Sequence, residues 1–423
     1  YSGEKFDDAR VAPLEPLTED TYCLELWHGP TCAFKDMALQ MLPHLLTASL
    51  RKNGEQRTAC ILVATSGDTG KAALEGFCDV NQTRILVFYP KDGVSDIQKL
   101  QMVTQKGANV HAVAVEGNFD DAQTGVKILF GSQPLAQELQ EHGCAFSSAN
   151  SINWGRLVPQ IVYYFSAYAD AVNSGRIENG APVNFAVPTG NFGDILAGFY
   201  AKLMGLPVNK FICASNSNNV LTDFINTGVY NRKRPFHKTI SPSMDILVSS
   251  NLERLLFEET GHDAAQVAEW MKELNEKGEY KIGTELQNQI LKDFFGTWVD
   301  EVETRETIGD VYNNYGYVMD PHTAVAYKAM EKYRLMTGDE TYSIVLSTAS
   351  PFKFNDVVLA SIDPDTYEGK GLDPFVAMED LSRLAKLPIP ASMQELPKLQ
   401  RRQSDVIDKT QLEAEVKKLL GME

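Results

Sequence analysis

Two glycine-bearing loops constrain the fold of this 423-residue chain more than any other feature. Residues 65–70 (TSGDTG) and 187–194 (VPTGNFGD) each follow a short apolar run and open a helical segment. A strand that passes through such a loop into a helix is the repeating element of parallel α/β sheets. The predicted strands are the apolar runs at residues 60–64, 85–89, 110–115, 183–187 and 342–346. We therefore expect an α/β fold with parallel sheets.

Helical patterns complete this expectation. A helix is predicted from about residue 194 to residue 204, ended by Gly205. Residues 250–305 are charged and helical without a strand pattern, which indicates an all-helical insertion. The C-terminal tail ends in an amphipathic helix over residues 410–420.

Composition excludes several classes of function. A net charge of -17 argues against nucleic acid or an anionic membrane as the main partner. No apolar run is long enough to span a membrane, and the N-terminus does not have the pattern of a signal peptide. The 6 cysteines form no CxxC pair, which indicates a reducing compartment and predicts a cytoplasmic protein. The 7 histidines are scattered, so no metal is expected.

A basic cluster occupies residues 232–238 (RKRPFHK). We interpret it as a solvated loop, and the alternative is a loop that helps to attract an anionic substrate.

Lys35 is the first candidate catalytic residue. It lies in the stretch HGPTCAFKD, residues 28–36, just past a Gly-Pro turn and among small or apolar neighbours. A desolvated lysine has a lowered pKa, which frees its amine for Schiff-base chemistry. Taken alone, a solvated lysine at the start of a helix is the commoner arrangement.

The two loops have the properties of anion sites. Backbone N–H groups at a helix N-terminus bind phosphate, and glycines let them approach it closely. The first loop is not a P-loop, because Thr65 and Ala72 replace the required glycine and hydroxyl residue. The second lacks the third glycine of a dinucleotide fingerprint, which disfavours NAD. Together with Lys35 they indicate a phosphorylated cofactor and a phosphorylated substrate, and a capped turn without a ligand is the alternative for the first loop.

A third segment, residues 148–156 (SANSINWGR), gathers amide, hydroxyl and guanidinium donors. Arg156 can bind a phosphate bidentately. The structural alternative is an N-cap, in which Ser151 or Asn153 begins a helix that continues through Tyr168. The two interpretations are compatible.

The chain resembles the threonine synthase family in its short motifs. They are GPTxAFKD at residues 29–36, TSGDTG at 65–70, PTGNFG at 188–193, SPSMDI at 241–246 and SSN at 249–251. The resemblance extends from residue 6 into the C-terminal tail, to the branch with a long helical insertion found in bacteria and fungi. It implies the tryptophan synthase β-like, type II pyridoxal-phosphate architecture of two open parallel αβα domains. The segment with which the family usually begins is largely absent from this chain.

The resemblance also implies residue roles. Lys35 matches the lysine that binds pyridoxal 5'-phosphate as a Schiff base, and Thr348 matches the hydroxyl that faces the pyridine nitrogen. Asp68 matches the residue beside the cofactor's 3-oxygen, where the wider fold type often has Asn and where a carboxylate could repel a phenolate. The matches to the cofactor-phosphate loop are Gly190, Asn191, Phe192 and Gly193. The matches to substrate-binding residues are Thr65, Ser66, Gly67 and Thr69, and, for the substrate phosphate, Asn150, Ser151, Asn153 and Arg156.

The activity implied by the resemblance is conversion of O-phospho-L-homoserine and water to L-threonine and phosphate, the last step of threonine biosynthesis. Lys35 would act as the base at Cα and Cβ. Alternatives are an O-phosphohomoserine phospho-lyase that releases 2-oxobutanoate and a catalytically silent paralogue. A serine or threonine dehydratase is disfavoured, because an unphosphorylated substrate has no use for Asn150, Ser151 and Arg156.

The family fold divides the chain into a smaller α/β domain at residues 38–149 and a large cofactor-binding domain. The large domain would comprise residues 1–37 and 150–423, with the insertion at about 250–305. We expect a monomer or small homo-oligomer that binds a small-molecule substrate.

Overall fold

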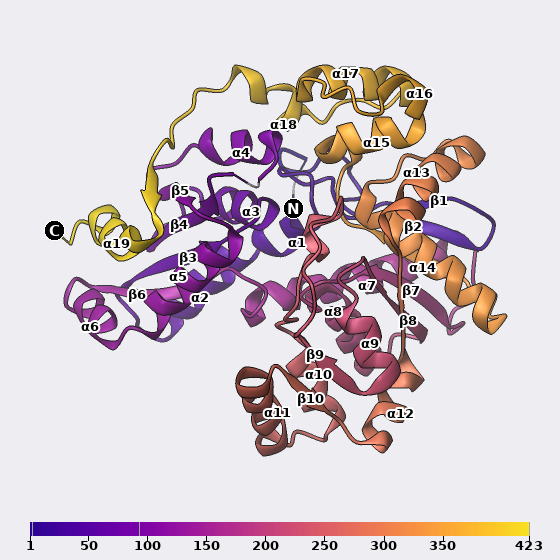
Figure 1. Ribbon diagram of the computed structural model, residues 1–423, viewed down its shortest axis with the longest axis horizontal. Helices are drawn as coiled ribbons and strands as arrows, with labels where there is room; N and C mark the ends of the chain where they lie inside the picture. The colour runs from indigo at the N-terminus through magenta and orange to yellow at the C-terminus, as the bar shows by residue number, and fades with distance from the viewer. Residues whose placement is uncertain (2, 93, 423) are drawn as a thin grey trace. The chain divides into compact units, whose positions relative to one another are not determined.

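The structure, a computed structural model, describes residues 1, 3–92 and 94–422. Contacts among Cα atoms divide the chain into two compact units (Figure 1). Unit 1 comprises Tyr1–Asp7, Gly29–Pro159 and Ile389–Glu423. Unit 2 comprises Asp8–His28 and Gln160–Pro388, so that the boundary falls inside helix α7, Trp154–Asn173. The division differs from the expected domains in placing residues 1–7, 29–37, 150–159 and 389–423 with the smaller unit.

Unit 1 alternates strands and helices. Its elements in chain order are α1 Lys35–Leu39, α2 Leu42–Lys52, β3 Thr58–Ala64, α3 Asp68–Phe77, β4 Thr83–Pro90, α4 Asp96–Val103, β5 Val110–Glu116, α5 Phe119–Gly131, α6 Gln133–Glu141, β6 Cys144–Ser148, the first part of α7, α18 Ala391–Gln394, η3 Leu396–Lys398, β13 Val406–Asp408, η4 Lys409–Gln411 and α19 Leu412–Leu420.

The unit 1 sheet has the strand order β13-β5-β4-β3-β6, with every described pair parallel. Alternate residues of a strand point to opposite faces. On β3, Ile61 and Val63 pack with α3, whereas Cys60 and Leu62 pack with α5, α6 and α19. These contacts place α3 on one face of the sheet and α5, α6 and α19 on the other. Unit 1 is therefore a three-layer αβα arrangement, as the sequence predicts.

The C-terminal segment belongs to unit 1 for a physical reason. Strand β13 adds to the edge of the sheet by pairing in parallel with β5, from Val406 opposite Ala114 onward. The apolar face of α19 then buries Val416 and Leu420 in the same cluster as Val113 of β5. In Figure 1 this segment is the yellow chain that ends beside β5 and α5. The tail is therefore part of the core of unit 1, whereas the family fold predicts it in the larger domain.

Unit 2 contains the remaining elements. They are β1 Leu14–Pro16, β2 Thr21–Glu25, the rest of α7, β7 Val183–Pro188, α8 Gly193–Leu203, β8 Val208–Ser215, α9 Val220–Thr227, β9 Val229–Asn231, η1 Pro242–Met244, α10 Leu252–Glu259, α11 Ala264–Lys277, β10 Glu279–Lys281, α12 Thr284–Asp293, β11 Phe294–Trp298, α13 Glu301–Tyr315, α14 Pro321–Thr337, β12 Ser343–Ser347, η2 Pro351–Phe354, α15 Asn355–Ile362, α16 Pro364–Tyr367 and α17 Pro374–Ala385.

The unit 2 sheet has the strand order β1-β2-β12-β7-β8-β11. Strand β1 runs antiparallel to β2, and the other pairs are parallel. Strands β7 and β12 are buried along their whole length, which matches their nearly continuous apolar sequence and is typical of strands covered on both faces. The carboxyl ends of β12, β7 and β8 consequently open at one edge, where Thr348 and the second glycine loop follow.

The predicted all-helical insertion is wrong at two places. Strand β10 pairs antiparallel with β9, and β11 pairs in parallel with β8 at the edge of the large sheet. The β11 sequence, FFGTW, is rich in β-forming aromatic residues, but it is short and lies between two charged helices. Its partner Phe211 is far away in the chain, so a local pattern does not show the pairing.

Candidate active site

Lys35 is the first residue of α1, and only 7% of it is exposed. Its Nζ lies 3.4 Å from Oδ2 of Asp68, the first residue of α3, which is also buried. The same amine lies 4.8 Å from the centre of the Phe34 ring. The solvated-surface alternative for Lys35 is therefore excluded. An amine removed from bulk water beside a carboxylate is suited to Schiff-base chemistry.

Asp36 explains the turn that precedes Lys35. Its Oδ2 accepts the backbone N–H of Thr31 at 2.8 Å, and its Oδ1 accepts the Thr31 hydroxyl at 2.7 Å. A Cβ on Gly29 would lie 2.6 Å from Asp36, so the glycine allows this close packing. Asp36 is completely buried and ties the turn to the first turn of α1. Asp36 belongs to the GPTxAFKD motif, but the motif alone does not indicate this structural role.

Gln98 also belongs to this site, although it was not predicted from the sequence. Its Nε2 donates to Oδ1 of Asp68 at 2.8 Å, and its Oε1 accepts the hydroxyl of Ser95, the N-cap of α4, at 3.2 Å. A Cβ on Gly67 would lie 2.5 Å from the Gln98 side chain, which explains one glycine of the first loop. Gln98 is 30 residues from its partner, and no local pattern marks it. We call Lys35, Asp68 and Gln98 the lysine centre.

The first glycine loop is closed by its own threonine. The Thr65 hydroxyl accepts the backbone N–H groups of Gly67 at 3.0 Å and Gly70 at 2.9 Å. Thr65 is buried, whereas Ser66 and Thr69 are partly exposed at the start of α3. The hydroxyl of Thr65 is thus accounted for by turn geometry. Substrate contacts of Thr65, Ser66, Gly67 and Thr69 stay predictions.

The segment before α7 is held by the side chains predicted to bind phosphate. Asn153 Oδ1 accepts the N–H of Gly155 at 2.9 Å, which is an N-cap contact, and its Nδ2 donates to the Ser148 carbonyl at 2.7 Å. The Arg156 guanidinium donates to the carbonyl of Ala149 at 3.0 Å. The N-cap interpretation of Asn153 is therefore confirmed. Burial lowers the pKa of Arg156 to about 10, which leaves it charged at neutral pH.

Unit 1 brings its predicted site residues to one edge of its sheet. Strands β3 and β6 pair in parallel, so the loops that follow them leave from the same edge. The Nδ2 of Asn150 donates to the carbonyl of Ala64, the last residue of β3, at 3.4 Å. The residues gathered by this edge and the adjacent α1 are Lys35, Thr65, Ser66, Gly67, Asp68, Thr69, Asn150, Ser151, Asn153 and Arg156.

The second glycine loop, residues 189–193, leads from β7 into α8 in unit 2 and is called the glycine loop below. A Cβ on Gly190 would lie 2.8 Å from the carbonyl oxygen of Ser243, so two backbones touch there. Phe192 has a left-handed φ of 61°, and its ring is buried 5.7 Å from that of Phe294. Because the Phe192 ring is buried in the core, the backbone of residue 192 forms the turn at the N-terminus of α8. Backbone N–H groups in such a turn can bind a phosphate.

The SSN motif fastens the glycine loop. Ser249 donates its hydroxyl to the carbonyl of Gly190 at 2.9 Å. Asn251, which is completely buried, donates to the carbonyl of Asn191 through its backbone N–H at 3.1 Å and its Nδ2 at 2.9 Å. Three donors thus hold two consecutive carbonyls of the loop. This contact explains why the two motifs occur together in the sequence.

Thr348 lies at the same edge of unit 2. It follows β12, which pairs in parallel with β7, the strand that leads into the glycine loop. Thr348 is buried, with 5% exposed. Unit 2 therefore gathers Gly190, Asn191, Phe192, Gly193 and Thr348 at the carboxyl edge of its sheet.

Three ionisable residues at the end of β2 were not predicted as site residues. Glu25 Oε2 lies 2.9 Å from Nε2 of His28, and Glu25 Oε1 accepts the hydroxyl of Tyr317 at 2.8 Å. Glu25 is opposite Ser347 in the sheet, one residue before Thr348. Burial and the nearby Glu25 charge raise the pKa of Tyr317 well above its ordinary value, which keeps its hydroxyl a donor.

Two basic side chains of the cluster at residues 232–238 form ion pairs. Arg234 donates to Asp223 at 2.8 Å and to the carbonyl of Asn231 at 2.9 Å. Lys233 forms an ion pair with Glu279 at 3.2 Å. Pairing reduces the attraction of this cluster for an anion, in agreement with the interpretation as an ordinary loop.

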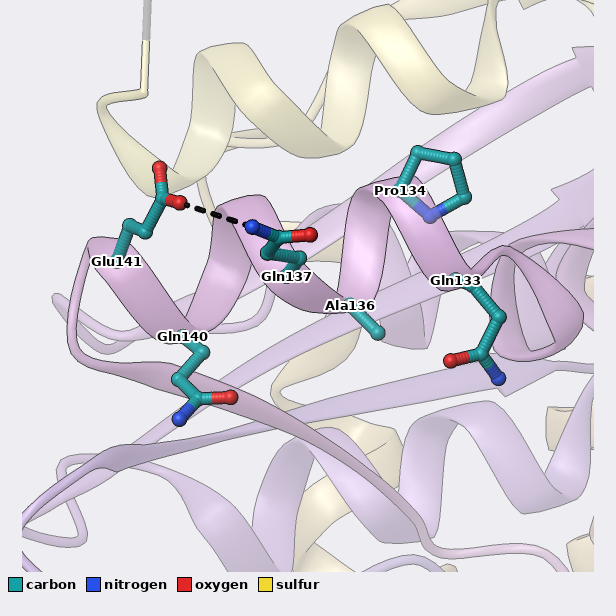
Figure 2. Close-up of a pocket in the computed structure, with 6 residues that line it drawn as sticks. All are labelled: Gln133, Pro134, Ala136, Gln137, Gln140 and Glu141. Carbon is teal, nitrogen blue, oxygen red and sulfur yellow. Dashed lines mark hydrogen bonds between the residues drawn. The ribbon is translucent and has the colours of Figure 1, made fainter.

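A hollow along α6 is the pocket shown in Figure 2. It is lined by Gln133, Pro134, Ala136, Gln137, Gln140 and Glu141. The side chains come from one helix, on which Gln137 donates to Glu141 at 3.4 Å. No predicted site residue lies on α6. We assign this hollow no functional role, because a single helix supplies its described lining.

Other features of the described residues bear on the sequence predictions. Among them, no helix has the length and apolar character needed to cross a membrane. In the same part of the chain, no cluster of three or more His, Cys, Asp or Glu side chains could hold a metal ion. None of the described cysteines, at positions 23, 32, 60, 78, 144 and 213, forms a disulfide with another described cysteine.

Comparison with known proteins identifies two sequence families in the chain. Residues 9–285 match the family described as pyridoxal-phosphate dependent enzyme. Residues 323–419 match the family described as threonine synthase, C-terminal. The two matches together include both glycine loops, Lys35, Thr348 and the C-terminal segment of unit 1.

Individual relatives agree with these matches. The human protein Threonine synthase-like 1 is 43% identical over 368 residues, which is 85% of this chain and 49% of the human protein. The chain thus spans about half the length of the curated Threonine synthase-like 1 relatives it matches. Threonine synthase of Pseudomonas aeruginosa is 43% identical over 351 residues, 82% of this chain and 71% of that protein.

A solved structure confirms the fold. The crystal structure of pyridoxal-phosphate-bound threonine synthase from Brucella melitensis is similar with a TM-score of 0.84 and 38% identity. The similarity covers 98% of this chain and 82% of that one. The expected type II pyridoxal-phosphate architecture is therefore confirmed.

Each unit, taken by itself, has residues whose chemistry suits one part of pyridoxal phosphate. In unit 1, the buried amine of Lys35 has the chemistry to bind an aldehyde. In unit 2, the Gly190 backbone lies so close to the Ser243 carbonyl that a Cβ would not fit, and the loop continues into the N-terminus of α8. Such a turn suits a phosphate. From the matched families, the relatives and these two sets of residues, we conclude that the chain belongs to the threonine synthase family of pyridoxal-phosphate-dependent enzymes.

Proposed function

We propose that the protein converts O-phospho-L-homoserine and water to L-threonine and phosphate. The observation that carries this proposal is the buried contact of 3.4 Å between Lys35 Nζ and Asp68, on the sheet edge that also holds Arg156. Unit 1 thus contains both an amine that can transfer protons, Lys35, and a cation that can bind a phosphate group, Arg156. The relatives named threonine synthase support the same assignment.

Lys35 is the proposed base. Its Nζ takes a proton from Cα of the substrate and then one from Cβ, and it returns protons to Cγ and Cα. When bound, pyridoxal phosphate supplies the electron sink that stabilises negative charge at these carbons. The Cγ–O bond breaks with its electron pair leaving on phosphate, the oxygen of water bonds to Cβ, and the remaining water proton goes to phosphate. Asp68, fixed by Gln98, orients the amine.

Two sets of residues are proposed to bind phosphate groups. The substrate phosphate is assigned to Arg156 with Asn150, Ser151 and Asn153, because a buried guanidinium that stays charged is a strong anion partner. The cofactor is assigned to Lys35 and Asp68 in unit 1. In unit 2 the assigned residues are Gly190, Asn191, Phe192, Gly193 and Thr348.

The test is turnover of O-phospho-L-homoserine by protein loaded with pyridoxal phosphate. We expect equal amounts of phosphate and L-threonine, with L-homoserine, which lacks the phosphate, as the unreactive control. Release of phosphate with 2-oxobutanoate would replace the proposal by a phospho-lyase. Cofactor binding without any product would contradict both activities.

A catalytically divergent paralogue is the second candidate. It is favoured by one observation: the human relative at 43% identity carries the name Threonine synthase-like 1, and the chain covers half of it. The intact lysine centre argues against loss of chemistry. A screen of other O-phosphorylated amino acids, with phosphate release as the readout, distinguishes altered substrate choice from inactivity.

The proposal also includes a reducing location, the cytoplasm, and a monomer or small homo-oligomer. The absence of disulfides among the six described cysteines supports the first part. The net charge of -17 supports a small-molecule substrate over nucleic acid. Localisation of a fluorescent fusion and sedimentation of the purified chain test these two statements.

A further inference from the structure

The SPSMDI motif, residues 241–246, has no role in the chemistry proposed so far. Its central residues form the 3-10 turn η1, Pro242–Met244, which lies against the glycine loop. A Cβ on Gly190 would lie 2.8 Å from the carbonyl oxygen of Ser243 and 3.1 Å from Cα of Met244. The position of η1 therefore limits where the backbone of Gly190 can lie.

His322 holds η1 from the other side. The backbone N–H of Ser243 donates to Nε2 of His322 at 3.1 Å, and Nδ1 of His322 lies 2.7 Å from Oδ1 of Asp320. Since Nε2 accepts, the proton of the neutral ring is assigned to Nδ1, which donates to Asp320. His322 is 2% exposed, with its ring 5.0 Å from that of Phe354. This buried histidine has no place in the catalytic steps.

The support behind His322 is rigid. Asp320 is the N-cap of α14 and accepts the N–H groups of His322 at 2.8 Å and of Thr323 at 3.3 Å. Pro321 occupies the first position of the helix, where its fixed φ suits the helical conformation. The imidazole thus projects from a capped helix end. A side chain on a helix is held in place more precisely than one on a loop, so His322 can fix the position of η1.

We propose that His322 is a positioning residue for the cofactor-phosphate loop. Its Nε2 holds the Ser243 N–H, η1 holds the backbone of Gly190, and the N–H groups of the glycine loop are thereby preorganised for a phosphate. A loop already held in its bound conformation loses less entropy on binding, so cofactor affinity is higher. This inference rests on the proposed role of residues 190–193 in holding the cofactor phosphate.

Two substitutions separate this role from simple filling of the core. His322→Gln places an amide oxygen near the position of Nε2, where it can accept the Ser243 N–H. His322→Leu has a similar volume and no acceptor. If the leucine variant does not fold, His322→Asn replaces it, because its amide ends one carbon short of Ser243 while remaining polar.

The measurement is a titration of each unloaded protein with pyridoxal phosphate, followed by absorbance, together with phosphorus NMR of the bound cofactor. The leucine or asparagine variant should bind about tenfold more weakly, because the hydrogen bond from the Ser243 N–H to residue 322 is lost. The glutamine variant should stay within about threefold of the unmodified protein and keep its phosphorus chemical shift. Melting temperatures of the unloaded variants show whether a general loss of stability explains the result.

Two outcomes would overturn the inference. One is unchanged affinity and phosphorus shift in the leucine or asparagine variant, and the other is a glutamine variant as weak as these. Gly190→Ala is the control for the loop, since unchanged cofactor binding in that variant would remove the proposed role of residues 190–193. Turnover is measured separately: tight binding without L-threonine would contradict the proposed function and leave the inference on His322 intact.

Discussion

The lysine centre and the glycine loop are built in different ways. In unit 1, Lys35, Asp68 and Gln98 contact one another through side chains, so each contact depends on charge and proton position. In unit 2, Gly190 and Asn191 are held through their backbone carbonyls and by close backbone packing. Substitutions in the lysine centre should therefore change chemistry and pH dependence. Substitutions around the glycine loop should change affinity.

Lys35→Ala should have the largest effect and test the chemical half of this comparison. Turnover should fall at least about a thousandfold, because the proton-transfer amine is absent. Lys35→Arg is the control, since it keeps a positive charge beside Asp68 without a reactive amine and should be equally inactive. Product formation from O-phospho-L-homoserine is the measurement, and wild-type turnover in the alanine variant would contradict the mechanism.

Gly190→Ala tests the second part of this comparison, the prediction that changes at the glycine loop weaken cofactor binding. The added Cβ would meet the Ser243 carbonyl at 2.8 Å, so the loop must shift. Pyridoxal phosphate should bind roughly tenfold more weakly or worse, and excess cofactor should restore part of the turnover. Gly131→Ala is the matched control, because its Cβ would have no atom within 4 Å. Equal affinities of the two variants would show that loop shape is unimportant.

Gln98→Leu tests whether the lysine centre controls the pH dependence of activity, and its effect should be smaller than those of the two substitutions above. Removing the donor at 2.8 Å disfavours the carboxylate form of Asp68, which then takes up a proton more readily as pH falls. The acid side of the pH–activity profile should therefore move to higher pH. Gln101→Leu, in the same helix and also buried, is the control. A profile that is identical in both variants would exclude Gln98 from the lysine centre.

Asp339→Asn tests stability away from both regions and should have the smallest effect on activity. Asp339 accepts from Asn209 at 2.9 Å and from the backbone N–H of Thr341 at 2.9 Å, beside the start of β8. The variant should lose about 1 kcal/mol of unfolding free energy with turnover unchanged. Chemical denaturation measures the first quantity, and a loss of turnover at saturating cofactor would show coupling to the active site.

The pH dependence of that stability has a defined sign. Burial alone would raise the pKa of Asp339, but hydrogen bonds from Thr341 and Tyr333 outweigh it and lower the pKa from 3.8 to about 2. A carboxyl with a lowered folded pKa stabilises the protein above its unfolded pKa, and the stabilisation is lost as pH falls toward 2. The asparagine variant should lack this part of the acid sensitivity.

Local sequence was sufficient for the main strands and for both glycine loops. Runs such as β3 and β7 are continuous and apolar, because strands covered on both faces need apolar residues at every position. Lys35 was predicted to be the Schiff-base lysine because it lies in a dense motif. The N-cap role of Asn153 also follows from local pattern, and the structure confirms it.

Contacts between distant residues were missed for a common reason. Gln98 and His322 contact partners 30 and 79 residues away, and a single polar residue inside a helix has no distinguishing local pattern. Strand β11 is stabilised by pairing with β8, and β13, only three residues long, by pairing with β5. Such pairings depend on the assembled sheet, so periodicity within a short window does not show them.

The place of β13 and α19 in unit 1 has a consequence for how the protein is made. Residues 389–423 leave the ribosome only after the whole of unit 2 has been synthesised. Until then the exposed edge of β5 and the apolar surface of α5 lack their cover. Unit 1, although begun first, is the last to be finished, and in the interval its open sheet edge is a site where chaperones or other nascent chains can bind.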